Sequence, residues 1–103
     1  MESYEILWKT ALPELEMSCS TISFDNYISH LIPVDVVGGK LILCTRSELF
    51  AKTVEGKMRE KICNALFKAN SEVVDFSVVV AESREDYIKQ RGDLAIDRFE
   101  NKG

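Results

Sequence analysis

Two consecutive glycines, Gly38 and Gly39, separate two short apolar runs, residues 34–37 and 40–45. Both runs are rich in valine, leucine and isoleucine, the residue types typical of strands. Paired glycines supply the positive φ angles that a tight two-residue turn between antiparallel strands requires. The sequence therefore predicts a β-hairpin here, and this is the strongest local signal in the chain.

Two helical patterns precede the hairpin. The first runs from Tyr4 to about Met17, with Ser3 as its N-cap, and its apolar residues recur at helical spacing. That stripe is Tyr4, Leu7, Trp8, Ala11, Leu12 and Leu15. Pro13 predicts either a kink near Lys9 or a break into two pieces, because an interior proline removes a backbone hydrogen bond.

The second pattern begins after a turn that ends in Ser20 and Thr21, either of which can serve as an N-cap. It runs to about Leu31, because Pro33 restricts the residue before it. Phe24, Tyr27, Ile28 and Leu31 form its apolar stripe.

A third helix is predicted from the N-cap Ser47 to about Ala69, where Asn70 is a natural stop. Its apolar residues are Leu49, Phe50, Val54, Met58, Ile62, Ala65, Leu66 and Ala69. Because neighbouring residues on a helix point in different directions, Leu49 and Phe50 cannot both face the core. One of the two is expected near the surface, where it hints at an interaction patch.

A last strand is predicted over residues 73–80. Val74, Phe76, Val78 and Val80 alternate on one face, with Asp75 and Ser77 on the other. The order is helix, helix, strand, strand, helix, strand, which indicates a two-layer α+β domain with a three-stranded sheet packed by helices.

We expect residues 1–81 to form this domain and residues 82–103 to be a charged C-terminal tail, a further helix or the start of a linker. Tyr87, Ile88, Leu94, Ile96 and Phe99 give the second segment a weak helical stripe, interrupted at Gly92.

Charge and cysteine usage narrow the class of protein. The net charge is −4 and the pI is about 5.0, whereas a duplex-DNA binder usually presents a basic face. Cys19, Cys44 and Cys63 lie far apart, without the spacing of a metal site or disulfide framework. No apolar run approaches the length of a membrane span. We expect a cytoplasmic protein with reduced, buried or half-buried cysteines and no membrane partner.

The residues needed for catalysis do not gather in any recognisable pattern. The single histidine, His30, lies at the polar end of the second helix, and no phosphate-binding loop is present. The carboxylates are scattered among lysines, as on a solvated face. The sequence therefore predicts a protein that is not an enzyme and that needs no cofactor or metal.

Several segments together resemble the N-terminal domain, domain I, of the bacterial replication initiator DnaA. The segments are residues 6–12, which include Leu7 and Trp8, residues 23–28, and residues 39–43 followed by 47–51. The resemblance covers about residues 4–81. Thr45-Arg46-Ser47 replaces the family's usual Ala-Pro-Asn, and Tyr27 stands where the family has a tryptophan.

The resemblance implies a KH-like fold that serves as a protein-docking and oligomerisation module of replication initiation. Its implied partners are the replicative helicase, initiation regulators and a second copy of the chain. It places partner contacts at Ser23, Asn26, Tyr27, Leu49 and Phe50, and self-association at Trp8. Ser23 falls where some members carry an acidic helicase contact, and its side chain is neutral.

Two other readings remain open. KH-like folds can bind single-stranded nucleic acid weakly, which here would use Arg46, Lys52, Lys57, Arg59 and Lys61, with stacking on Tyr27 or Phe50. The acidic balance and the missing GxxG loop weigh against it. A purely structural oligomerisation unit built on Trp8 is the other reading.

Overall fold

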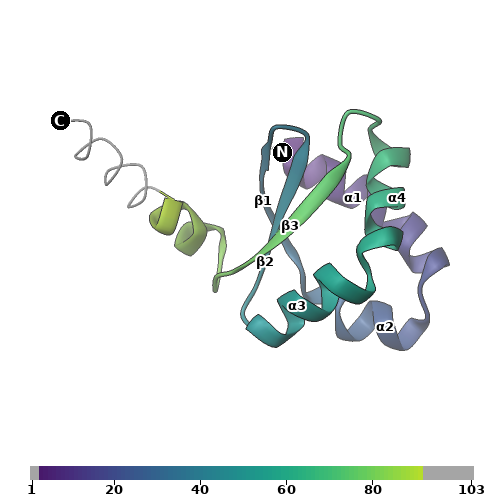
Figure 1. Ribbon diagram of the computed structural model, residues 1–103, viewed down its shortest axis with the longest axis horizontal. Coiled ribbons are helices and arrows are strands. Elements are labelled where there is room, and N and C mark those ends of the chain that lie inside the picture. The colour runs from purple at the N-terminus through teal and green to yellow at the C-terminus, as the bar shows by residue number, and fades with distance from the viewer. Residues whose placement is uncertain (1–2, 92–103) are drawn as a thin grey trace.

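In the computed structural model, which describes residues 3–91, α-helices α1 to α4, a short 3-10 helix and a helical segment at residues 84–91 accompany a three-stranded sheet (Figure 1). In chain order the elements are α1 (Ser3–Ser18), α2 (Thr21–Asn26), η1 (Ile28–His30), β1 (Ile32–Val37), β2 (Lys40–Thr45), α3 (Glu48–Lys57), α4 (Arg59–Ala69) and β3 (Asp75–Val80). The predicted α+β class and the order of helices and strands are confirmed. Within the described residues, no helix is long and apolar enough to cross a membrane.

The hairpin forms at the predicted glycines. Gly38 and Gly39 have φ angles of 57° and 76°, and the turn joins Val37 to Lys40 in the antiparallel ladder of β1 and β2. A side chain at Gly39 would also meet the Glu72 carbonyl oxygen at 3.0 Å. β2 is the central strand, because β3 pairs with its other edge in parallel.

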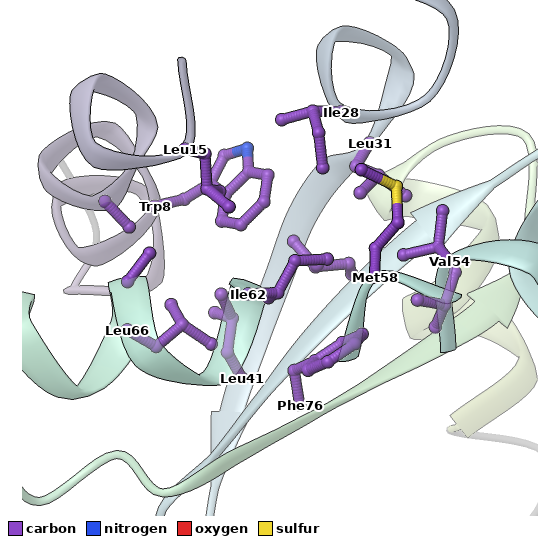
Figure 2. Close-up of a cluster of buried hydrophobic side chains, with 14 of the residues drawn as sticks. Trp8, Leu15, Ile28, Leu31, Leu41, Val54, Met58, Ile62, Leu66 and Phe76 are labelled. Carbon is purple, nitrogen blue, oxygen red and sulfur yellow. The ribbon is translucent and has the colours of Figure 1, made fainter. Parts of the chain in front are cut away.

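The main core lies between the sheet and the helices (Figure 2). Leu41 and Leu43 of β2 and Phe76 of β3 project from the sheet into this core and are almost fully buried. The helices contribute Trp8, Leu15, Ile28, Val54, Met58, Ile62 and Leu66. α1 packs on α4 and β1, whereas α3 packs mainly on β3.

Helix α1 is continuous through Pro13, so the expected break does not occur. The missing proline N–H leaves one carbonyl without its usual donor, but the buried stripe on both sides of Pro13 anchors the helix to the core.

The predicted second helix is shorter than expected. α2 ends at Asn26 and the chain continues as η1, which turns Ile28 and Leu31 into the core. Strand β1 then begins at Ile32 and includes Pro33, with a bulge between Pro33 and Asp35. A bulge is expected there, since proline has no N–H to give to a ladder.

The predicted long third helix is wrong in one respect, because it is divided at Met58. Met58 has φ −110° and ψ 5°, outside the helical region, and its side chain is buried in the core. The break lets α3 lie over β3 while α4 turns to pack along α1. The predicted caps are confirmed: the Ser47 hydroxyl accepts from the Phe50 amide at 3.3 Å, and Asn70 ends α4.

Two of the four predicted inward residues of the last strand are exposed. Phe76 and Val78 are buried as expected, but Val74 and Val80 are 64% and 44% exposed. Val74 lies between a turn and the strand, next to the buried Val73, and Val80 lies at the end of β3.

The second face of the sheet carries a smaller apolar cluster of Val34, Cys44 and Ala81. Residues 84–91 are helical, and Tyr87 packs on this cluster. The Tyr87 hydroxyl donates to Asp35 Oδ2 at 3.0 Å, and Arg91 pairs with the same carboxylate. Of the predicted C-terminal stripe, Leu94, Ile96 and Phe99 lie outside the described residues.

Candidate interaction surface

The two helices that carry the predicted partner contacts each begin at a serine cap. The Ser20 hydroxyl accepts from the Ser23 amide at 3.1 Å, which starts α2, and Ser47 starts α3 in the same way. In both cases the side-chain oxygen satisfies a backbone donor that the first helical turn leaves free. These local contacts fix where α2 and α3 begin.

The structure brings Tyr27 and Phe50 together. Their ring centroids lie 5.2 Å apart with the planes at 61°, an edge-to-face arrangement. Both side chains are half-buried, and Tyr27 also packs against the main core. The pair therefore supports the junction of α2 and α3 as well as forming part of its surface.

Leu49 is the residue of the Leu49–Phe50 pair that faces solvent, with 71% of its surface exposed. Asn26 is exposed at the end of α2, and Ser23 is half-buried one turn earlier. These five predicted contacts thus lie on α2, at its C-terminal end and on α3 (Figure 1). Among their three apolar or aromatic side chains, Leu49 is the exposed one. We call Ser23, Asn26, Tyr27, Leu49 and Phe50 the α2–α3 surface.

A pocket of about 450 Å³ adjoins this surface, with Phe50 in its wall. Ser29 and His30 of η1 line one side, and Thr45 and Arg46 at the end of β2 line another. Ile32, Ser47 and Ala81 complete the lining. Thr45, which was not among the predicted contact residues, is the one buried polar residue among those described, at 5% exposure.

Trp8, the predicted self-association residue, is 4% exposed and lies in the core between α1 and the other helices (Figure 2). Self-association through Trp8 stays a prediction, and it would require α1 to release a side chain that this fold buries.

The cations proposed for nucleic-acid binding are partly neutralised. Arg59 pairs with Asp75 at 2.5 Å and stacks over the Phe76 ring at 5.0 Å, while Lys52 pairs with Glu48 at 3.5 Å. Arg46 has no acidic partner among the described residues. The basic residues therefore do not form one continuous free strip.

Two of the three thiols, those of Cys44 and Cys63, are poorly suited to act as nucleophiles. Burial raises the pKa of the Cys44 thiol, and burial together with the nearby Asp75 carboxylate raises that of Cys63. Both therefore hold their protons more strongly than a free cysteine does. Across residues 3–91, no group of three or more His, Cys, Asp or Glu side chains is arranged to hold a metal ion.

No protein-family model matches the chain, and no curated protein matches it either. The likeness to DnaA domain I therefore depends on the residues quoted above, and what it implies about function is a proposal.

Proposed function

We propose that this chain is a protein-docking module of replication initiation that acts in the cytoplasm and binds its partner through the α2–α3 surface. The observation that carries the proposal is the exposure of Leu49, at 71%, beside the half-buried Tyr27–Phe50 pair. An exposed leucine beside a packed aromatic pair is apolar surface that a partner can remove from water when it binds. The replicative helicase, initiation regulators and a second copy of the chain are the partners that the family resemblance implies.

The size of the surface sets the expected affinity. Five residues on two short helices can bury only part of the roughly 800 Å² per partner that a standard stable interface uses. Micromolar binding, strengthened by avidity when several copies gather, fits such a surface.

The competing function, weak single-stranded nucleic-acid binding, has less support. Two of its five proposed cations are already in ion pairs, and the chain carries a net charge of −4. A positively charged groove that tracks the nucleic-acid backbone is the usual basis of such binding.

A pull-down from lysate of the source organism tests the proposal. The baits are the wild-type chain, Leu49→Ser and a control, Val74→Ser, which removes a similarly exposed apolar side chain. The register of β2 and β3 places Val74 near the hairpin, at the opposite end of the sheet from Thr45 and the start of α3.

Loss of replication-initiation proteins from the Leu49→Ser bait alone is the expected result. Equal recovery by all three baits, or recovery of nucleic acid alone, would contradict the proposal.

A further inference from the structure

The pocket beside Phe50 is lined by a buried polar side chain, that of Thr45. Thr45 lies on the same face of β2 as the core residues Leu41 and Leu43, because side chains alternate along a strand. Its side chain is therefore directed toward the helices, into the space lined by Phe50, His30 and Ser47. Thr45 is 95% buried, from an exposure of 5%.

The Thr45 hydroxyl has no hydrogen-bond partner among residues 3–91. No half-buried or buried side-chain oxygen or nitrogen in this range is both sealed from solvent and unpaired, so this hydroxyl must open into the pocket. A buried hydroxyl that keeps a free donor costs free energy unless a ligand or solvent satisfies it. Thr45 therefore offers a directed polar contact at the base of the pocket.

One cationic side chain shares the pocket lining with this hydroxyl. Arg46 lines the pocket, is exposed and has no carboxylate partner in the described part of the chain. The imidazole of His30 also lines the pocket, and none of the lining residues is acidic. The pocket also adjoins the start of α3 at Ser47, where the helix dipole adds positive potential. Glu48, two residues after Arg46 in the sequence, pairs instead with Lys52.

The rest of the wall is apolar. Phe50, Ile32 and Ala81 lie in the same lining, and Ile32 is 42% exposed. The pocket thus combines donors for one anion with a place for a small apolar group. A guanidinium beside a hydroxyl suits a planar carboxylate, which can accept two parallel hydrogen bonds from arginine.

We propose that this pocket binds an acidic side chain, aspartate or glutamate, that neighbours an apolar residue in a segment of the protein partner. The inference rests on the proposed docking function and specifies the chemistry of the partner. The apolar residue contacts Leu49 and Phe50, while the carboxylate enters the pocket to meet Arg46, His30 and Thr45. A polyanion fits less well, because the whole chain has a net charge of −4, which repels an extended chain of phosphates.

The test uses NMR titration of the 15N-labelled chain with two dipeptides, acetyl-Leu-Glu-amide and its neutral match, acetyl-Leu-Gln-amide. We expect millimolar binding of the first, as befits so small a ligand. The shifted amides should be those of residues 29–30 and 45–50, and the neutral dipeptide should bind roughly tenfold more weakly, as a charge-assisted hydrogen bond predicts.

Three variants locate the contact. Arg46→Gln and Thr45→Val should each weaken binding of the acidic dipeptide, by roughly tenfold and fivefold, because each removes a donor to the carboxylate. Lys61→Gln removes one exposed positive charge from α4, away from the pocket lining, and should leave binding unchanged. A 15N spectrum of each variant without ligand establishes that it is folded.

Equal binding of the two dipeptides, shifts elsewhere on the protein, or undiminished binding by folded Arg46→Gln would overturn the inference. Inorganic phosphate and a short oligothymidylate are titrated in the same way as the dipeptides. Tighter binding of either at the same amides would identify a phosphate site and also overturn it.

The outcomes separate this inference from the docking proposal. If partner capture depends on Leu49 but not on Arg46, the pocket has no role and docking stands. If the dipeptide binds as described but capture does not depend on Leu49, the docking proposal fails and acid recognition stands.

Discussion

The rings of Tyr27 and Phe50 meet edge to face, with centroids 5.2 Å apart, and join the end of α2 to the first turn of α3. The contact fixes the relative position of the two helices that carry the α2–α3 surface. Leu49, beside this pair on α3, has an exposed apolar side chain, with 71% of its surface accessible to solvent. Substitution of either aromatic residue is therefore expected to affect both stability and binding. Substitution of Leu49 is expected to affect binding alone.

A double-mutant cycle measures this aromatic contact. Tyr27→Leu, Phe50→Leu and the double variant should give a coupling free energy of about 0.5–1.5 kcal/mol, the range for edge-to-face aromatic pairs. Urea unfolding, monitored by circular dichroism, gives the change in the free energy of unfolding for each of the three variants relative to the wild type. Strictly additive losses would mean that the two rings stabilise the fold independently.

Asp75 is expected to contribute to the loss of fold stability at acidic pH. A hydrogen bond from the Phe76 amide, at 2.8 Å, is the main cause that lowers the Asp75 pKa, with Arg59 adding to it. Since the folded-state pKa lies below the ordinary value near 3.8, the carboxylate stabilises the fold above that pH. This contribution is lost as the pH falls through the lowered pKa.

The Asp75→Asn variant should therefore be less stable than the wild type at neutral pH. On acidification below about pH 4, it should lose less stability than the wild type does. Urea midpoints from pH 7 to pH 2.5, compared with the wild type, test this. Parallel profiles for the two proteins would show that Asp75 has the same pKa in the folded and unfolded chains.

Glu55 of α3 binds the backbone of β3, because its Oε2 accepts from the Val78 amide at 3.2 Å. Glu55→Ala should cost about 1 kcal/mol, since the amide then loses a charged acceptor, and should speed hydrogen exchange at Val78 more than at other β3 amides. Glu55→Gln keeps an uncharged acceptor, so its stability and its exchange rate at Val78 should lie between those of the wild type and Glu55→Ala. Unchanged exchange at Val78 in Glu55→Ala would show that the contact gives no protection.

Tyr87 is expected to shield Cys44. Cys44 is fully buried, and Tyr87 packs on the cluster that contains it. In a background of Cys19→Ala and Cys63→Ala, Tyr87→Ala should raise the rate of thiol labelling roughly tenfold, the factor given by about 1.4 kcal/mol of lost closing free energy.

Tyr87→Phe is the matched variant, because it keeps the ring and loses only the hydrogen bond to Asp35. It should label at a rate near that of the background. If Tyr87→Ala also labels at that rate, residues 84–91 do not control access to the second face of the sheet.

Features with a local physical cause were predictable from the sequence. Gly38 and Gly39 specify the hairpin because only positive φ angles close so short a turn. Ser47 was recognisable as a cap, and Ser20 as one of two candidates with Thr21, because such hydroxyls satisfy donors a few residues away.

Features that depend on distant packing were not predictable. Val54, Met58 and Ile62 recur four residues apart, so their pattern continues through a break that exists because α3 and α4 pack on different partners. Val74 fits the alternation of β3 but lies just before the strand begins at Asp75.

Among the candidate site residues, the exposure of one residue of the Leu49–Phe50 pair followed from helix geometry. The pocket at Thr45 did not, although its position on the inward face of a buried strand carried a signal. A polar residue at such a position needs a partner, and within residues 3–91 the fold provides none.

Titration of the 15N-labelled chain with the purified replicative helicase of the source organism tests the central claim most directly. The account predicts that amides of residues 22–27 and 48–50 shift or broaden, that Leu49→Ser abolishes the effect, and that Val74→Ser preserves it. A spectrum that the helicase leaves unchanged, or perturbation confined to other residues, would contradict the claim that this surface docks the helicase.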